Sequence, residues 1–320
     1  MPEFILVGDL HLTDRTPSTR VGDLFEDQVK LLEEIASYAK PHSWLLMPGD
    51  LGHRRDWSPA VLTWFIDYLS THFPGRAVCT LGQHDLQDHN VQGYSAESDV
   101  GVLEAAGVLT VLVGGQYIDV PGKVPVKIAG YAWGDVTATK NSLNVPRGTI
   151  ALVHAPVALN KEQGRLPLSS LRIKGEGVIL FGDTHAGFDR VDVSGVACLC
   201  PGVLTAMNSA EAYVRSRIYI YNSDKHTLIE RTLKSVTPEF LHNAKPTAQA
   251  VTQGYEALLK AAQTQTVSDD PKEFIATVVA NMQVSLREQQ EYDDPHVLEH
   301  TFKRLDHASQ HLLQRYIDIS

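Results

Sequence analysis

Acidic, histidine and amide side chains recur in five short motifs along the first two thirds of the chain. The motifs are Asp9-Leu10-His11, Gly49-Asp50, Gly82-Gln83-His84-Asp85, His154 and Gly182-Asp183-Thr184-His185. Carboxylate oxygens, amide oxygens and imidazole nitrogens are the side-chain atoms that bind divalent cations. Any one of these motifs occurs by chance in many proteins, so their meaning depends on the elements that position them.

Each motif directly follows a segment that the sequence predicts to be a strand. These strands are Glu3–Val7, Ser43–Met47, Arg76–Leu81, Thr149–Val153 and Val178–Phe181. Ligands in open α/β sheets gather at the carboxyl ends of the strands. We therefore expect one metal-binding cluster. Helix caps and structurally paired loop histidines would explain any single motif, but not five motifs in the same relation to a strand.

The remaining pattern predicts two packed sheets flanked by helices. The first 106 residues alternate strands with amphipathic helices, a rhythm typical of parallel sheets. The predicted helices are Phe25–Lys40, Pro59–His72 and Asp99–Ala106. Closely spaced strands follow, at Leu109–Val113, Tyr117–Val120, Val124–Ala129, Arg190–Val193, Ala197–Cys200, Arg217–Tyr221 and Thr227–Thr232.

After Val236 the strand pattern stops, and two or three amphipathic helices are expected. Asp269-Asp270-Pro271 and Asp293-Asp294-Pro295 have the acids and proline of a helix start. We predict an α/β domain over residues 1–235 and a helical extension over residues 236–320. The apolar face of Leu298–Ile317 suits a partner-docking helix, a homodimer contact or packing on the first domain.

The composition is that of a soluble globular protein, with 43% apolar and 21% charged residues. No apolar stretch is long enough to span a membrane, and the N-terminus is predicted to be a first strand rather than a signal peptide. The three cysteines, Cys79, Cys198 and Cys200, suit buried thiols in a reducing cytoplasm. The net charge of −10 argues against general nucleic-acid binding by the chain alone. A metal centre or a partner would have to supply positive charge locally.

In order and spacing, the motifs resemble the D-x-H, GD, GNH[DE], H and GHxH series of the calcineurin-like metallophosphoesterases. The resemblance runs from residue 4 to about residue 233. It implies a four-layer α/β/β/α sandwich, which here carries a short C-terminal helical extension, and two divalent ions. Manganese is expected, with magnesium, iron and zinc as alternatives.

The resemblance also assigns roles to residues. One metal would be bound by Asp9, His11 and His185, the other by Gln83, His154 and Asp183, and Asp50 would bridge the two. His84 would lie beside the scissile phosphate. Protonated, it would donate a proton to the leaving oxygen or stabilise the transition state.

Further roles are predicted for neighbouring residues. We assign Asp85 to the catalytic group as a residue that orients His84 or its loop, with capping as the alternative. His53, Arg54 and Arg55 are candidates for substrate binding, because Arg pairs next to such a site favour phosphate contacts.

Two positions depart from the family pattern, and both belong to the second metal. The family has Asn where this chain has Gln83, and His where it has Asp183. Gln carries the same carbonyl on a longer stem, and Asp replaces a neutral nitrogen ligand with an anionic oxygen that favours a harder ion. The second site is then either remodelled and occupied, which we favour, or weak and empty.

Within the superfamily, the opening Gly8-Asp9-Leu10-His11-Leu12 resembles the SbcD-type DNA repair exonucleases and their bacteriophage relatives. This likeness implies a DNA exo- or endonuclease subunit acting in repair, recombination or replication. It also implies an SbcC-type ATPase as a partner for the C-terminal helices. A small-substrate phosphodiesterase for cyclic nucleotides or second messengers, and a non-enzymatic interaction module, remain as alternatives.

Overall fold

The structure of the protein is a computed structural model, which describes residues 2–86, 98–160, 165–208 and 211–240. The chain divides into two compact units, residues 1–241 and 242–320. All described residues belong to the first unit. The helices predicted after residue 246, including the candidate docking segment Leu298–Ile317, lie outside the described residues.

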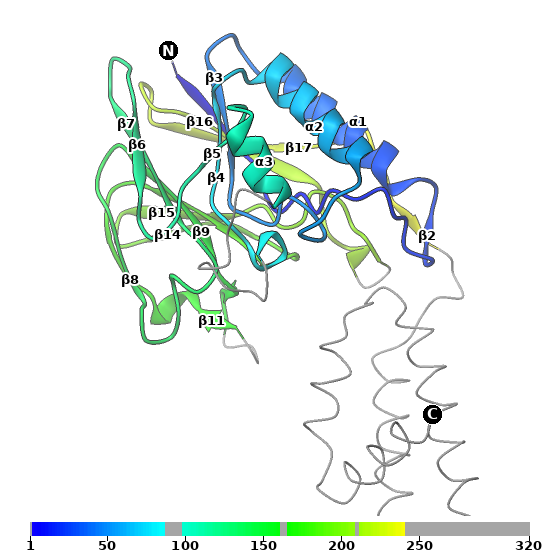
Figure 1. The fold of residues 1–320 in the computed structure, drawn as a ribbon. Coiled ribbons are helices and arrows are strands. Elements are labelled where there is room, and N and C mark those ends of the chain that lie inside the picture. The colour runs from blue at the N-terminus through cyan, green and yellow to red at the C-terminus, as the bar shows by residue number, and fades with distance from the viewer. Residues whose placement is uncertain (1, 87–97, 161–164, 209–210, 241–320) are drawn as a thin grey trace, which may run out of the picture. The chain divides into compact units, whose positions relative to one another are not determined.

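Two six-stranded sheets form the body of the first unit (Figure 1). The first has the order β17 (Thr227–Thr232), β16 (Arg217–Asn222), β1 (Glu3–Leu6), β3 (Ser43–Met47), β4 (Ala77–Cys79), β5 (Thr110–Val111). The second has the order β14 (Phe188–Val193), β15 (Val196–Cys200), β13 (Val178–Gly182), β9 (Thr149–His154), β7 (Val126–Tyr131), β6 (Tyr117–Val120). The strands that precede the predicted ligands are parallel neighbours in each sheet, β1-β3-β4 and β9-β13. Their carboxyl ends therefore share an edge.

Side chains of alternate residues on the central strands face different cores, as the period of two along a strand requires. On β1, Phe4 and Leu6 enter a core between the two sheets, which also holds Leu152 and Leu180. Ile5 faces the opposite way, into a core shared with the helices. The two-sheet α/β sandwich predicted from the sequence is confirmed.

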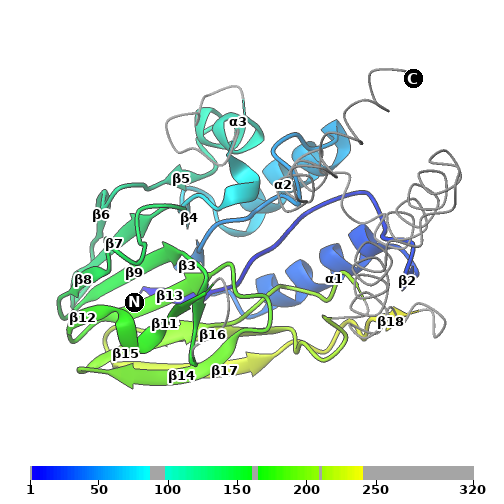
Figure 2. The same cartoon turned by 90° about the horizontal axis from the view of Figure 1, so that it is seen from below.

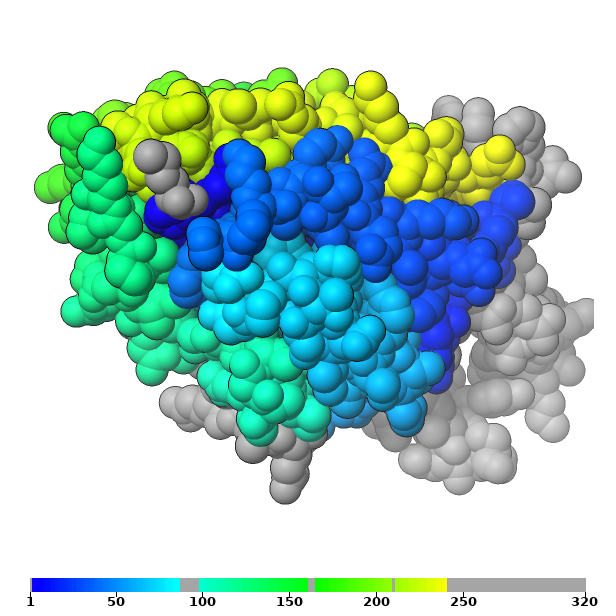
Figure 3. Space-filling model, turned by 90° about the horizontal axis from the view of Figure 1, so that it is seen from above, coloured from blue at the N-terminus to red at the C-terminus, as the bar shows by residue number. Residues whose placement is uncertain are grey.

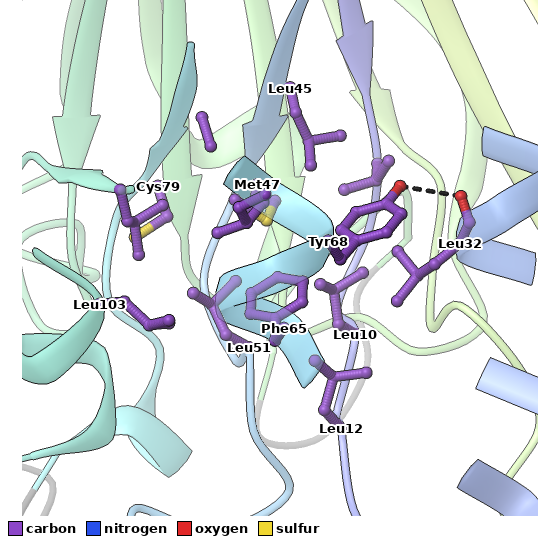
Figure 4. Packing of buried hydrophobic residues seen from close by; sticks show 14 of the residues in the cluster. Leu10, Leu12, Leu32, Leu45, Met47, Leu51, Phe65, Tyr68, Cys79 and Leu103 are labelled. Atoms are coloured by element: carbon purple, nitrogen blue, oxygen red, sulfur yellow. Dashed lines mark hydrogen bonds between the residues drawn. The ribbon is translucent and has the colours of Figure 1, made fainter. Parts of the chain in front are cut away.

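Three helices cover the face of the first sheet that is turned away from the second sheet (Figures 1 and 2). They are α1 (Leu24–Ser37), α2 (Pro59–His72) and α3 (Asp99–Ala105). Each begins at a side-chain cap, from Asp23, Ser58 and Ser98 respectively. Figure 4 shows how Phe65 and Tyr68 of α2 pack among the leucines of this core, where the Tyr68 hydroxyl donates to the Leu32 carbonyl at 2.8 Å.

The outer face of the second sheet is covered differently. Among the described residues, this cover is built from short strands and a 3-10 helix rather than from an α-helix. The elements are β8 (Ser142–Val145), β10 (Val157–Ala158), β11 (Leu166–Pro167), η4 (Leu168–Ser170) and β12 (Arg172–Gly175). Leu143, Leu168 and Ile173 from this layer pack on Phe181 and Cys198 of the sheet. The cysteines predicted to be buried thiols are indeed free and buried.

Of the strands that the sequence did not predict, one lies beyond Val236, where the strand pattern was expected to stop. β18 (Glu239–Phe240), after Val236, pairs antiparallel with β2 (Arg20–Val21). The prediction that strands stop at Val236 was wrong because this pairing joins two-residue segments far apart in sequence, which carry no alternating pattern. The space-filling view in Figure 3 likewise shows the last described strands lying against the N-terminal segment, in agreement with the β1–β16 pairing.

No helix in the described parts of the chain is both long enough and apolar enough to cross a membrane.

Candidate metal centre

The five predicted strand ends meet at one place between the two sheets. Asp9 and His11 follow β1, and the backbone N–H of His11 donates to the Asp50 carbonyl at 3.0 Å after β3. From the second sheet, the Asp183 backbone N–H donates to Asp9 Oδ2 at 2.8 Å. His154, predicted to follow its strand, is instead the last residue of β9. The sequence-predicted cluster therefore assembles across both sheets.

Glycines before the ligands allow the strand ends to approach this closely. A Cβ atom at Gly82 would lie 2.0 Å from Asp50 Oδ1, and one at Gly182 would lie 2.6 Å from Asp9 Oδ1. Real Cβ atoms do not approach other atoms at such distances, so neither position tolerates a side chain. These two glycines are thus part of the architecture that brings the carboxylates together.

Three of the predicted ligands have a left-handed backbone conformation, which residues other than glycine rarely adopt. The φ angles are 46° at His11, 49° at Asp50 and 73° at Asp183. Strained backbone persists only where the surroundings over-determine it, and it collects at functional sites. The strain here falls on residues that the sequence predicted to bind metal.

The first predicted ligand set is compact. One ligand atom from each of Asp9, His11 and His185 lies within 4.8 Å of the other two. The two Nε2 atoms of the histidines are 3.0 Å apart. Asp9 Oδ1 is buried and has no hydrogen-bond partner. A buried carboxylate oxygen without a partner is costly unless a cation satisfies it, so these three residues fit a divalent ion.

The second predicted set is held together by the Gln83 amide. Its Oε1 lies 2.7 Å from His154 Nε2, and its Nε2 donates to Asp183 Oδ1 at 2.6 Å. The longer side chain of Gln therefore reaches the other two residues of the set. The set offers a carbonyl oxygen, an imidazole nitrogen and a carboxylate oxygen, which also fit a divalent ion.

Asp50 lies between the two sets. Its Oδ2 atom is 3.7 Å from His11 Nε2 and 3.4 Å from His154 Nε2. This oxygen is fully buried and accepts no hydrogen bond of ordinary geometry. Asp50 Oδ2 therefore lies within 4 Å of one histidine of each predicted set.

Backbone and carboxylate acceptors orient the imidazole rings. The Pro48 carbonyl accepts from His154 Nδ1 at 2.8 Å, and Glu211 Oε1 lies 2.7 Å from His185 Nδ1. Because these acceptors take the Nδ1 proton, Nε2 of each ring is directed at the cluster as a ligand atom. Glu211 was not predicted. It lies 26 residues after His185 in a stretch without strand or helix periodicity, and only a search for carboxylates that could pair with ligand histidines would have suggested it.

The protonation of the metal-free cluster follows from its burial and charge. Burial raises the pKa of Asp9 to about 7, against the opposing charge of His154. Burial would lower the pKa of His154, but the Asp50 carboxylate raises it to about 10. Burial likewise opposes protonation of His185, and Glu211 raises that pKa to about 9. Protonated imidazoles therefore balance the carboxylates, and a divalent ion would compete with these protons.

His84 lies beside the ligands without belonging to either set. Its ring centroid is 4.9 Å from that of His11, and its backbone N–H donates to Asp50 Oδ1 at 2.9 Å. The His53 carbonyl accepts from His84 Nδ1 at 2.8 Å, so Nε2 is the ring atom that remains for proton transfer. The His53 ring stacks on His84 at 5.6 Å. Burial lowers the pKa of His53 to about 4, with a further contribution from His84.

The Asp85 carboxylate accepts hydrogen bonds from the backbone of two loops rather than from the His84 ring. Its fully buried carboxylate accepts from the backbone N–H groups of Asp50, Leu51 and Gly82 at 2.8, 3.0 and 2.9 Å. Burial, together with the charge of Asp50, raises the pKa of Asp85 to about 7. Among the contacts described, none joins this carboxylate to the His84 ring, so Asp85 positions the loops that carry Asp50 and Gln83.

The other two residues predicted to bind substrate, Arg54 and Arg55, directly follow His53. Arg54 is exposed and Arg55 is half-buried. Arg54 and Arg15 line a cavity of about 240 Å³ together with Trp57. The loop that carries Arg54 is joined to the loop after His11 by a backbone bridge between Leu12 and Gly52. The cavity is thus lined by two arginines, and also by two carboxylate residues, Asp14 and Asp56.

Comparison with known proteins agrees with this geometry. The family model described as calcineurin-like phosphoesterase matches residues 2–187, which is more than half of the chain and spans the positions of all seven predicted ligands. A search of curated proteins found no match.

Two of the solved structures that are similar to this chain have low sequence identity to it. One is described as a novel archaeal phosphodiesterase (14% identity, 72% of this chain and 99% of that chain, TM-score 0.36). The other is a 5'-nucleotidase precursor from Thermus thermophilus (14% identity, 82% of this chain and 58% of that chain, TM-score 0.38). Neither likeness bears on substrate. On the family match, the chain belongs to the calcineurin-like phosphoesterases, a family of metal-dependent hydrolytic enzymes.

Proposed function

We propose that the protein hydrolyses phosphodiesters at a centre of two divalent ions that share Asp50. The observation that carries the proposal is the position of Asp50 Oδ2, buried without a hydrogen bond between His11 Nε2 and His154 Nε2. An ion in either set would give this buried oxygen a partner. Because the oxygen lies within 4 Å of one histidine of each set, it could serve both ions.

The chain's residues would hold the two ions as two unequal sets. Asp9, His11 and His185 would bind one, and Gln83, His154 and Asp183 the other. When bound, such ions supply Lewis acidity toward a phosphoryl oxygen and make hydroxide available near neutral pH. We propose manganese as the ion, because the carboxylate of Asp183 in place of an imidazole favours a hard or borderline cation.

In this proposal His84 handles the leaving group. Its Nδ1 proton is committed to the His53 carbonyl, so the second proton of the imidazolium form lies on Nε2, which delivers it to the departing oxygen or donates a hydrogen bond to a phosphoryl oxygen. The backbone bond to Asp50 Oδ1 fixes His84 relative to the shared carboxylate. Asp85 serves the reaction indirectly, since it fixes the backbone of the loops on which Asp50 and His84 depend.

We propose a DNA strand as the substrate. The exposed guanidinium of Arg54, next to His53, is suited to a backbone phosphate beside the scissile one, and Arg15 on the same cavity would add a second contact. The net charge of −10 would then limit DNA binding to the neighbourhood of the centre. The same charge favours the second candidate, a small phosphodiester. An SbcC-type partner for the C-terminal helices, repair, recombination or replication as the setting, a cytoplasmic location and a homodimer remain predictions from the sequence.

The test is a manganese-supplemented assay with linear DNA and, in parallel, bis-p-nitrophenyl phosphate. DNA cleavage that His84→Ala abolishes supports the nuclease. Turnover of the small diester alone supports the second candidate. No turnover of either substrate in manganese, magnesium, iron or zinc would contradict both. If DNA cleavage requires an added SbcC-like ATPase, the role of the helical extension in binding that ATPase becomes the leading question.

A further inference from the structure

A second cavity is lined in part by residues that directly follow His185 in the sequence. Its volume is about 390 Å³, and its walls come from Leu159, from residues 186–189 with Val191, and from Tyr213, Arg215 and Arg217. Binding sites for small organic groups have volumes of a few hundred cubic ångströms. The cavity is therefore large enough for one base and its sugar.

All three walls follow residues of the metal centre in the sequence, and two of them follow closely. Residue 186 follows His185, and Leu159 is five residues beyond His154. Tyr213 is two residues beyond Glu211, whose carboxylate pairs with His185. Consecutive Cα atoms are about 3.8 Å apart, so two of the walls begin within one or two residues of the centre. The hydroxyl of Thr184 donates to the Val157 carbonyl at 2.7 Å and ties the wall that carries Leu159 to the wall after His185.

The exposed side chains of this cavity are unusual for a protein surface. Tyr213 is 71% exposed and Leu159 is 44% exposed, and they are two of the five large apolar residues that are exposed in the described chain. Apolar groups gathered on a surface commonly mark an interaction site. Here they meet at a single cavity beside the metal ligands.

Two arginine side chains in the same cavity differ in how firmly their hydrogen bonds and ion pairs hold them. Arg217 is fixed in the back wall, because it is buried and donates to the Pro201 carbonyl at 3.2 Å and to Asp189. Arg215 is 65% exposed and only loosely paired, with its Nη2 3.8 Å from Asp189 Oδ1. An exposed ion pair at this distance contributes little, so a phosphate can replace Asp189 as the partner of Arg215.

We propose that this cavity is a nucleoside subsite. The base of the nucleotide next to the scissile phosphate stacks on the Tyr213 ring and against Leu159, and Arg215 contacts the following backbone phosphate. Stacking on aromatic side chains combined with a nearby cation is how proteins hold single-stranded nucleic acid. The proposal rests on the proposed phosphodiesterase function and extends it by assigning the residues that hold the base beside the scissile phosphate.

The test measures binding separately from turnover. The protein carrying His84→Ala and loaded with Mn²⁺ is titrated with a fluorescent tetrathymidylate and with a matched tetramer of abasic nucleotides. Stacking on an aromatic ring accounts for about tenfold in affinity per base. We expect Tyr213→Ala to weaken binding of the thymidylate about tenfold and to leave binding of the abasic strand within about twofold. Tyr213→Phe, which keeps the ring, should bind like the parent.

Tyr117→Ala is the matched control, because Tyr117 is an exposed tyrosine on β6 outside the cavity. It should leave both affinities unchanged. A Tyr213→Ala protein that binds thymidylate as tightly as the parent, or that loses the same factor for both strands, overturns the subsite. Turnover of bis-p-nitrophenyl phosphate by the protein with His84 intact tests the proposed function independently, because that diester carries no base.

Discussion

The two ligand sets differ in what their side chains do before a metal arrives. In the first set, Asp9 Oδ1 has no hydrogen-bond partner and faces two imidazoles. In the second, the Gln83 amide bonds both His154 and Asp183. A cation entering the first set replaces the contact between His11 Nε2 and His185 Nε2 but gives an unsatisfied oxygen, Asp9 Oδ1, a partner. A cation entering the second set must replace two hydrogen bonds of the Gln83 amide, so we expect it to bind more weakly.

Gln83 and Asp183, the two residues that depart from the family pattern, interact with each other directly. Gln83 and Asp183 are not independent replacements, since the amide of one donates to the carboxylate of the other at 2.6 Å. An Asn at 83 would be one methylene shorter, and a His at 183 would carry no carboxylate. The pair forms a unit that satisfies itself without a metal, which is a physical reason for unequal affinities at two sites that share one carboxylate.

The largest loss of activity is expected from a substitution that removes a ligand from both sets at once. Asp50→Asn removes the shared anionic ligand but keeps an oxygen for the His84 backbone N–H. Metal ions stabilise the charge of the transition state by several kcal/mol. Each 1.36 kcal/mol of activation free energy changes the rate by a factor of about ten. We expect kcat/KM for bis-p-nitrophenyl phosphate to fall about 10⁴-fold, with loss of bound Mn²⁺. The control is Asp67→Asn on the exposed side of α2, and activity of Asp50→Asn within about tenfold of wild type would refute the shared-ligand role.

A smaller loss is expected from a change that spares both sets. His84→Ala removes Nε2 as the proton donor, and general acid catalysis contributes about 10²–10⁴-fold. We expect kcat to fall about 10³-fold while the Mn²⁺ content of the protein stays at the wild-type level. His42→Ala, at an exposed position before β3, is the matched control. Loss of metal along with activity would mean that His84 is a ligand and not an acid.

A third change should separate the sets by weakening only the first. Glu211→Gln withdraws the carboxylate that holds His185 Nδ1, and such outer partners contribute about 10- to 100-fold to metal affinity. Titration with Mn²⁺ should show the tighter of two binding steps weakened by that factor and the other step unchanged. Glu239→Gln, at an exposed position on β18, is the control. If only the weaker step changes, the assignment of the two steps is reversed.

The smallest effect is expected from restoring the family residues in the second set. Gln83→Asn combined with Asp183→His exchanges the amide–carboxylate unit for a shorter amide and an imidazole. A nitrogen ligand in place of a carboxylate favours Zn²⁺ over Mn²⁺, and we expect the ratio of the two affinities at the weaker site to shift about tenfold. The tighter site should keep its preference. An unchanged ratio would show that position 183 does not bind metal.

Much of this centre could be predicted from the sequence, because strand ends in a parallel sheet share an edge and the motifs follow strands. That reasoning brought together Asp9, Asp50 and His154, which are indeed neighbours. It failed where a contact depends on the three-dimensional path of an irregular segment. Glu211 reaches His185 from a stretch with no periodicity, and β18 forms only because Arg20 and Val21 offer it an edge.

The exact ends of the strands and the role of Asp85 could not be predicted from the sequence either. The strand predicted at Val124–Ala129 is shifted to Val126–Tyr131, because its pairing with β9, from Lys127 opposite Thr149 to Tyr131 opposite Val153, decides where it ends. Asp85 stands next to His84 in sequence, which suggested that it orients that ring. Its carboxylate instead turns to backbone N–H groups of two loops, a choice that depends on distances between strand ends.

The central claim, two ions on two unequal sets joined by Asp50, is tested most directly by anomalous scattering from crystals soaked at increasing Mn²⁺ concentrations. We predict a first peak beside Asp9, His11 and His185 at low concentration. A second peak beside Gln83, His154 and Asp183 should follow at higher concentration, with Asp50 contacting both. A single peak at saturating Mn²⁺, with the hydrogen bond between Gln83 and Asp183 still intact, would contradict the account.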